Sequence, residues 1–495
     1  MNDSLEAFQK EQGKTPYLDA LIAYAKDKVV PFHVPGHKQG RGIHPKLKEW
    51  IGESYLSLDL TEVPGLDNLS QPKEALLQAM ELAAKAYGAD YTFFLVNGSS
   101  SGVHSMIMAA CNPGDKILIP RNAHKSVFAG LIFSGAVPVY MKPEFDYALQ
   151  MDHTITEETL VENLKEHPDS KAALLVSPTY YGVAANLERL VSIIHDSGKI
   201  ALVDEAWGPH FHFHPDLPVS AVDAKADLVV NSTHKLLSSL TQTSMLHLNG
   251  NRVDRARVES CLRLFTTTSP NCLLLASIDA CRMQMATQGK ELLDKAVSLA
   301  EKARAEIRDL SGVQCIGREI IGNPGVYALD PTRMVISLRS LGLTGYEVDE
   351  RLRSKGGVQI ELSDLFHVVA LVTISDSEKE VDQLVNGIKQ ILEIPNQESK
   401  GFLEKKGARL PDWPPLKLSP REAFVSQHET VLLEKADGRV STELITTYPP
   451  GIPAIAPGEE FTQDILDYLR LEQEAGSRIT GVADSTLQTV RVVKG

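Results

Sequence analysis

Residues 98–102 form the turn Gly-Ser-Ser-Ser-Gly directly after an apolar run, and such a turn could hold an anion. Backbone N–H groups at the start of a helix, together with serine hydroxyls, make a cradle that suits a phosphate group. A serine-rich turn by itself more often only caps a helix. The turn therefore becomes informative only in combination with other polar residues.

Three further polar features follow apolar runs in the same way. His124 lies in RNAHKS, where an imidazole could stack on a planar ring, although a lone loop histidine is usually structural. Asp204 ends the run IALVDEA, and a buried carboxylate there needs a partner: a protonated pyridine nitrogen, a helix end or a basic side chain. Lys235 closes the segment STHK, 31 residues after Asp204, which is one strand–helix–strand step. The carboxylate and the amine can then lie at neighbouring strand ends, on opposite sides of one flat ring.

Taken together, these features suit a phosphorylated pyridine aldehyde. Such a molecule needs a cradle for its phosphate, a ring to stack on, a partner for its nitrogen and an amine for its carbonyl group. We therefore predict pyridoxal 5′-phosphate as the cofactor, held by Lys235 as a Schiff base.

The elements that must position these residues form an α/β pattern. Short apolar runs alternate with amphipathic helices, which is typical of a mostly parallel sheet with helices on both faces. Open α/β sheets bind ligands at the carboxyl ends of their strands. The predicted strands are 92–96, 116–120, 137–141, 172–177, 200–206 and 227–232, followed by a long helix over 271–310.

Four segments are expected along the chain. Residues 1–74 form an N-terminal segment, 75–310 the large cofactor-binding domain, 311–395 a small α/β domain and 396–495 a C-terminal domain. The last of these begins with a linker rich in charge and proline. Smaller strands are predicted over 332–338 and 367–375.

Composition excludes several classes of protein. A formal net charge of −14 over 495 residues argues against nucleic-acid binding, which needs a basic surface. The five cysteines show no paired spacing, so neither a disulfide framework nor a metal site is expected. The polar N-terminus and short apolar runs indicate no secretion signal and no membrane span, so a cytoplasmic protein is expected.

The motifs NGSSSG, RNAHKS, VDEAWG and STHK, in this order, resemble the fold-type-I pyridoxal-phosphate-dependent Orn/Lys/Arg decarboxylases of bacteria. PFHVPGHKQG (31–40), FTTTSP (265–270) and YPPGIPAIAPGE (448–459) sharpen the resemblance, which covers nearly the whole chain. It implies an aspartate-aminotransferase-like large domain followed by smaller α/β C-terminal domains.

The resemblance also implies roles for individual residues. Lys235 would carry the cofactor beside His234, Asp204 would pair with the ring nitrogen, and His124 would stack on one ring face. These four form the predicted catalytic set. The other predicted cofactor contacts are Ala206 against the opposite face, Trp207 beside the ring, Ser100, Ser101 and Ser232 at the phosphate, and Thr267 across a dimer interface.

The chain is similar to the short, biosynthetic form of the family, because PFHVPGH begins at residue 31 and leaves no room for an N-terminal wing domain. A homodimer or larger homo-oligomer is expected, and a decamer is in doubt. The expected reaction is L-arginine to agmatine and CO₂, for polyamine biosynthesis. Lysine or ornithine is the alternative substrate, and Asp59, Glu62, Asp67 and Glu361 are acidic candidates for binding its side chain.

Two other functions stay open. An aminotransferase would share the cofactor residues but would grip the substrate carboxylate with an arginine, and Arg333 and Arg339 lie in a suitable region. A non-catalytic relative would bind no cofactor, which an absorbance spectrum would reveal.

Overall fold

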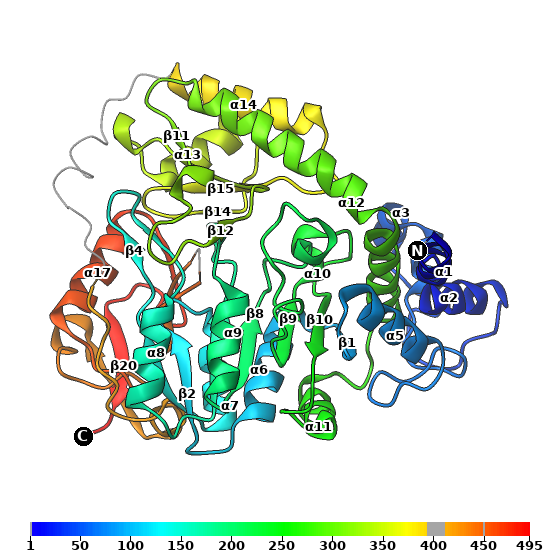
Figure 1. The fold of residues 1–495 in the computed structure, drawn as a ribbon, viewed down its shortest axis with the longest axis horizontal. Coiled ribbons are helices and arrows are strands. Elements are labelled where there is room, and N and C mark those ends of the chain that lie inside the picture. The colour runs from blue at the N-terminus through cyan, green and yellow to red at the C-terminus, as the bar shows by residue number, and fades with distance from the viewer. Residues whose placement is uncertain (1, 394–410, 449–450) are drawn as a thin grey trace. The chain divides into compact units, whose positions relative to one another are not determined.

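The structure is a computed structural model that describes residues 2–393, 411–448 and 451–495 (Figure 1). The chain divides into two compact units, one comprising Met1–Ala109 and Ile200–Leu293, the other Ala110–Lys199 and Asp294–Gly495. The domain boundaries after residues 74 and 310 stay predictions. The boundary after residue 395 and most of the predicted linker lie outside the described residues.

The large sheet has seven strands, in the order β1 (Tyr91–Leu95), β10 (Ser244–Leu248), β9 (Leu228–Asn231), β8 (Ile200–Asp204), β6 (Ala172–Val176), β2 (Lys116–Pro120) and β3 (Val137–Met141). β8 pairs with β9 in parallel, as β2 does with β3 and with β6, whereas β10 is antiparallel to both β1 and β9. The expected fold class, a mostly parallel sheet in a fold-type-I enzyme, is confirmed. The sheet has one strand more than predicted. β10 follows the predicted strand 227–232, and the apolar pattern did not reveal it.

The first unit contains the strands that carry most of the predicted site. Burial explains the strands: every residue of β8, β9 and β10 is buried. α5 ends at Gly88, which has the left-handed conformation that glycine adopts at low cost. The elements are α1 (Asn2–Gln12), α2 (Pro16–Lys26), α3 (Pro45–Ile51), α4 (Glu53–Leu58), α5 (Ala75–Tyr87), β1 (Tyr91–Leu95), α6 (Gly98–Ala110), β8 (Ile200–Asp204), β9 (Leu228–Asn231), α10 (Thr233–Leu236), β10 (Ser244–Leu248) and α11 (Arg255–Phe265).

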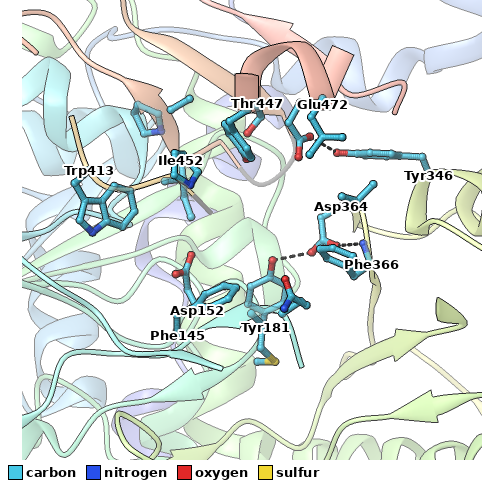
Figure 2. A pocket seen from close by; sticks show the side chains of 18 residues that line it. Phe145, Asp152, Tyr181, Tyr346, Asp364, Phe366, Trp413, Thr447, Ile452 and Glu472 are labelled. Carbon is cyan, nitrogen blue, oxygen red and sulfur yellow. Dashed lines mark hydrogen bonds between the residues drawn. The ribbon is translucent and has the colours of Figure 1, made fainter. Parts of the chain in front are cut away.

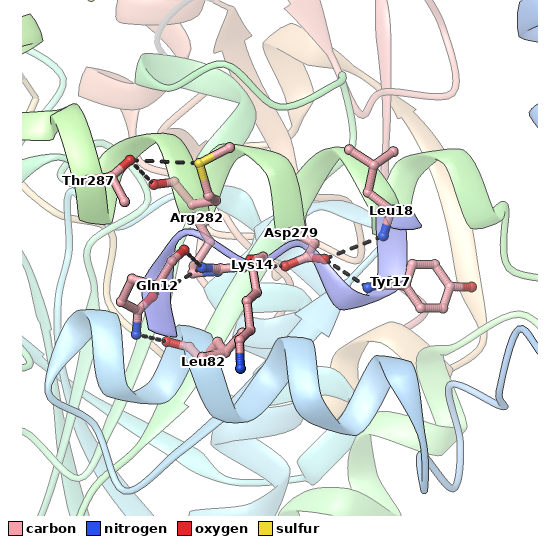
Figure 3. Close-up of polar contacts among 9 residues, drawn as sticks. Gln12, Lys14, Tyr17, Leu18, Leu82, Asp279, Arg282 and Thr287 are labelled. Atoms are coloured by element: carbon pink, nitrogen blue, oxygen red, sulfur yellow. Dashed lines mark hydrogen bonds and ion pairs between the residues drawn. The ribbon is translucent and has the colours of Figure 1, made fainter. Parts of the chain in front are cut away.

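A polar cluster joins the N-terminal helices of the first unit to α12 (Cys272–Arg308), the long helix predicted over 271–310 (Figure 3). Asp279 and Arg282, one helical turn apart, form a fully buried ion pair at 2.6 Å. The Asp279 carboxylate accepts a hydrogen bond of 2.9 Å from the Tyr17 backbone N–H, and Arg282 donates to the Gln12 side chain at 3.1 Å. Gln12 in turn donates to the Leu82 carbonyl of α5 at 3.1 Å. The N-terminal segment is therefore an integral part of this unit.

The second unit contains the remaining strands of the large sheet and the helices that follow them. α9 shows why these helices form: its buried residues, Leu187, Leu190, Val191 and Ile194, recur on one helical face, and the Asn186 side chain caps its first turn. These elements are β2 (Lys116–Pro120), α7 (Lys125–Ser134), β3 (Val137–Met141), β4 (Phe145–Asp146), β5 (Met151–Asp152), α8 (Glu157–Glu166), β6 (Ala172–Val176), β7 (Val183–Ala184) and α9 (Leu187–Asp196).

The second unit also holds smaller sheets, and two groups of elements there have their own cores. An antiparallel sheet in the order β11-β13-β15-β14 packs with α14, whose apolar face includes Val381, Leu384 and Ile388. A C-terminal group centres on buried Phe461, Leu466 and Val492. The elements are β11 (Gln314–Cys315), β12 (Ala328–Leu329), β13 (Arg333–Ser337), α13 (Gly345–Arg351), β14 (Leu362–Ser363), β15 (Val368–Leu371), α14 (Glu378–Leu392), α16 (Pro420–Val425), β16 (His428–Leu432), β17 (Ile445–Tyr448), β18 (Pro453–Ile455), α17 (Gln463–Glu474), β19 (Arg478–Thr480) and β20 (Thr489–Val493).

The cysteines and the apolar helices can be described directly. All five cysteines are buried free thiols. Within the described ranges, no helix has the length and apolarity that crossing a bilayer requires.

Candidate active site

The end of β8 presents a buried carboxyl group, Asp204. Its Oδ1 accepts a hydrogen bond of 3.1 Å from the Ala206 backbone N–H, and the residue is 6% exposed. Burial raises the pKa of Asp204, although the positive charge of Lys235 acts in the opposite direction. A cationic N–H group would stabilise the anionic form of this buried carboxyl group. A protonated pyridine nitrogen is such a group.

The next residue, Glu205, carries a second buried carboxyl group that was not predicted from the sequence. Its carboxyl group accepts hydrogen bonds from the Ala221 backbone N–H at 2.6 Å, the Ser220 hydroxyl at 3.2 Å and the Asn231 amide at 3.0 Å. Burial raises the pKa of Glu205 to about 8 despite these donors. Because Asn231 ends β9, Glu205 ties the ends of two neighbouring strands together. A second acid inside the apolar run IALVDEA was the available signal.

Lys235 lies on α10, the short helix that follows β9. Its Nζ is 3.8 Å from the centroid of the Trp207 ring, a distance at which the ring face attracts a cation. His234 Nδ1 lies 2.6 Å from the Thr243 carbonyl oxygen. A neutral His234 that donates from Nδ1 to this carbonyl has Nε2 left as an acceptor.

Ser232, the N-cap residue of α10, supplies the clearest sign of a missing ligand. The residue is fully buried, and in the described part of the chain its hydroxyl oxygen has no hydrogen-bond partner. Buried polar groups in folded proteins are nearly always hydrogen-bonded, so this hydroxyl indicates an absent acceptor or donor. A phosphate oxygen would satisfy it.

The serine-rich turn is the first turn of α6, not a separate loop before it. Gly98 begins the helix with φ +69°, and the Ser101 hydroxyl donates to the Gly98 carbonyl at 2.8 Å. Ser100 is half-buried and lies on the same first turn. A Cβ at Gly102 would lie 2.7 Å from Val230 Cγ2, so glycine lets α6 approach β9 closely. The Gly98 N–H donates to the Gln242 carbonyl at 2.8 Å, and the N–H groups that follow it in the first turn of a helix suit a phosphate group.

Nine of the ten predicted site residues belong to the first unit. They include Thr267, which is exposed in the loop after α11. His124 belongs to the second unit, where it is the N-cap of α7 and its Nδ1 lies 2.8 Å from the Ser126 hydroxyl. Stacking of His124 on the ring therefore stays a prediction, as do the cofactor contacts of the other nine residues.

Two of the acidic candidates for the substrate side chain are already engaged in their own loop. Glu62 accepts from the Asn68 amide at 2.5 Å and the Leu69 N–H at 2.8 Å, and Asp67 accepts from the Lys73 N–H at 3.0 Å. Both carboxylates thus stabilise the irregular segment over 59–72.

The loop that carries His124 is held by a buried ion pair. Arg121 and Glu459 are both fully buried, with Nη2 to Oε2 at 2.8 Å and Nε to Oε1 at 3.0 Å. Arg121 also donates to the Pro453 carbonyl at 2.7 Å, and the Lys125 backbone N–H donates to the Gly451 carbonyl at 3.2 Å. The segment 451–459 of the YPPGIPAIAPGE motif therefore anchors the loop 121–125. Pro449 and Pro450 of that motif lie outside the described residues.

Known proteins resemble this chain along nearly all of its length. Residues 15–380 match the family model of the Orn/Lys/Arg decarboxylase major domain, and residues 412–492 match that of the Orn/Lys/Arg decarboxylase C-terminal domain. The arginine decarboxylase of Bacillus subtilis is 43% identical over 98% of both chains. The arginine decarboxylase of Bacillus anthracis is also 43% identical, over 98% of this chain and 99% of its own.

Solved structures agree on the fold. The lysine decarboxylase LdcF of Francisella novicida superposes with a TM-score of 0.84 at 23% identity, covering 97% of this chain and 81% of its own. The predicted family and its pyridoxal phosphate cofactor are thereby confirmed. The chain belongs to the Orn/Lys/Arg decarboxylase family of pyridoxal-phosphate-dependent enzymes.

Proposed function

We propose that this chain decarboxylates L-arginine, giving agmatine and CO₂. The observation that carries the proposal is the 43% identity, over 98% of both chains, to an arginine decarboxylase. Relatives named lysine decarboxylase are more distant: the constitutive enzyme of Escherichia coli is 24% identical over 94% of this chain and 78% of its own. We therefore infer that the substrate is that of the more similar relatives, arginine.

The side chains of the first unit provide the groups that this reaction needs. Bound pyridoxal phosphate would supply an electron sink for the pair released when the bond between the α-carbon and the carboxylate breaks. Asp204 would keep the ring nitrogen protonated, and Ser232 with the start of α6 would bind the phosphate. Lys235 would hold the cofactor, and Lys235 or His234 would then donate the proton that replaces CO₂ on the α-carbon.

We infer a homodimer or larger homo-oligomer in the cytoplasm, serving polyamine biosynthesis. The exposure of Thr267 in the single chain supports a contact across a dimer interface. Mass measurement in solution, with and without Thr267→Arg, would test the interface: a monomeric wild-type protein would contradict the homo-oligomer.

The test of substrate choice is product analysis of the holoenzyme with arginine, lysine and ornithine side by side. We expect agmatine and CO₂ from arginine at a kcat/KM well above the values for the other two. A preference for lysine or ornithine would overturn the substrate assignment while leaving the family intact. Lys235→Ala should lose both the turnover and the visible absorbance of lysine-bound cofactor.

The contacts of Arg333 and Arg339 in the second unit do not favour the aminotransferase alternative. Arg333 is fully buried, donates to the Tyr180 carbonyl at 3.2 Å and lies 3.7 Å from Asp330. Arg339 donates to the Ala148 carbonyl at 3.2 Å. Both guanidinium groups are thus engaged in holding backbone segments. Amino transfer that depends on a 2-oxo acid, without CO₂ release, would restore this alternative.

A further inference from the structure

The second unit contains a pocket of about 110 Å³ that the proposed reaction does not use (Figure 2). We name it the acidic aromatic pocket. Its lining combines carboxyl groups with large aromatic side chains, among them Asp152, Asp364, Glu472, Tyr181, Tyr346 and Trp413. The carboxyl groups come from three segments far apart in the sequence, β5, the loop after β14, and α17.

The ionisable acids and bases among the described side chains that line this pocket are all carboxyl groups, apart from its tyrosines. Among the described residues that line it, there is no lysine, arginine or histidine. Two of the three carboxyl groups have partners in the wall. Asp364 accepts a hydrogen bond of 2.7 Å from the Tyr181 hydroxyl, and Glu472 accepts one of 3.0 Å from the Tyr346 hydroxyl. Asp364 also lies 3.1 Å from His367, a basic residue behind the lining.

Asp152 differs from the other two carboxyl groups. No hydrogen bond or ion pair of its side chain is found among the described residues, and Figure 2 shows its carboxyl group facing the same space as the Tyr181 hydroxyl. Burial, and then the negative charge of Asp364, raise the pKa of Asp152 to about 7. Asp152 is half-buried, and a cation placed in the pocket would give its carboxylate an ionic partner.

The lining favours an organic cation over a metal ion. In the described ranges, no group of three or more histidine, cysteine, aspartate or glutamate side chains is placed to hold a metal. Figure 2 shows Tyr181 between Asp152 and Asp364, Tyr346 beside Glu472, and Trp413 on the opposite side of the pocket. Aromatic faces attract ammonium and guanidinium groups, and they pack against the methylene chain that such groups carry.

We propose that the acidic aromatic pocket binds a small organic cation, an alkylammonium or alkylguanidinium. Asp152 receives the charged head, and the aromatic residues enclose its stem. The product of the proposed reaction, agmatine, belongs to this chemical class. The pocket would then be an amine-binding site whose lining residues all belong to the second unit, whereas Lys235 and Asp204 belong to the first.

Calorimetric titration of the holoenzyme with 1,4-diaminobutane and with agmatine tests the proposal. We expect saturable binding of both, no binding of the uncharged 1-butanol, and affinity about tenfold weaker in Asp152→Asn, because the ionic partner is lost while the shape is kept. Asp196→Asn is the matched control, since it removes one exposed carboxylate from the same unit. Its affinity should equal that of the wild type.

Hydrogen exchange of the wild-type holoenzyme gives the location of binding, and it does not depend on any variant folding correctly. Amine should slow exchange in segments 360–368 and 464–474, which contribute to the pocket wall. The proposal is overturned if neither amine binds at millimolar concentration, if Asp152→Asn binds as the wild type does, or if protection is confined to segment 230–240 around Lys235. Failure to make agmatine from arginine would refute the proposed function but leave these binding results standing.

Discussion

The buried pair of Arg121 and Glu459 allows a quantitative test of how the C-terminal segment is attached. Both side chains are fully buried, and the guanidinium group meets the carboxylate through two parallel contacts of 2.8 and 3.0 Å. Glu459→Gln removes the negative charge and leaves the guanidinium group buried without its anion. Breaking a buried pair on one side costs about 3–5 kcal/mol, because the remaining charge is uncompensated.

Urea unfolding followed by circular dichroism measures this loss, and the chain contains a matched control. Arg189 and Glu157 form a pair of similar length, 3.0 Å, but their side chains are 56% and 38% exposed. Glu157→Gln should cost less than about 1 kcal/mol, because water screens an exposed pair. Equal losses of unfolding free energy in the two variants would refute the reasoning.

A double variant separates charge burial from loss of shape. Replacing a buried pair with apolar side chains of similar volume is often neutral or stabilising. Arg121→Met combined with Glu459→Leu should therefore be more stable than Glu459→Gln alone, although it loses the hydrogen bond to Pro453. A double variant less stable than the single one would show that the hydrogen bonds dominate over the charge.

Three further variants test the first unit. Asp204→Asn should retain cofactor but lower agmatine formation at least about a hundredfold, since an amide cannot stabilise a cationic ring nitrogen; an unchanged rate would remove Asp204 from the reaction. Gly102→Ala should cost about 1–3 kcal/mol in urea unfolding, because its Cβ would lie 2.7 Å from Val230, whereas Gly36→Ala meets no atom within 4 Å and serves as the control. Burial raises the pKa of Glu205 to about 8, so the folded protein binds this proton more tightly than the unfolded chain. Stability should therefore decline as the pH rises from about 5 to about 8, and Glu205→Gln should flatten that decline.

Strands made mostly of apolar residues could be predicted from the sequence almost to the residue. β2 and β3 have the predicted limits, 116–120 and 137–141. β10 was missed because polar residues interrupt its apolar pattern: Ser244 and His247 are fully buried within it. His247 Nδ1 lies 2.8 Å from the Thr92 hydroxyl of β1, a cross-strand contact that gives one nitrogen of the buried ring a partner. Such a contact cannot be read from SMLHL alone.

The candidate site likewise has features that could be predicted from the sequence and features that could not. The positions of Asp204 and Lys235 could be predicted, because Asp204 ends one buried strand and Lys235 comes shortly after another; their roles stay predictions. The partners of Glu205 and Arg121 could not. Arg121 is separated from Glu459 by 338 residues, and only the folded chain brings the two together. The role of Glu459, the last residue of YPPGIPAIAPGE, therefore could not be read from that motif alone.

The two acids at the end of β8 show how neighbouring residues can serve different purposes. Consecutive residues of a strand point to opposite sides, so Asp204 and Glu205 enter different surroundings. Glu205 accepts three kinds of donor, and burial still raises its pKa to about 8, so at neutral pH it mostly holds a proton while it joins two strand ends. Asp204 has one backbone donor and the nearby charge of Lys235. Because Glu205 is mostly neutral, it adds little negative charge there, and the Asp204 carboxylate remains the group that a cationic ring nitrogen would meet. Ionisation of Asp204 should thus depend on the bound cofactor, whereas protonation of Glu205 should depend on the fold itself.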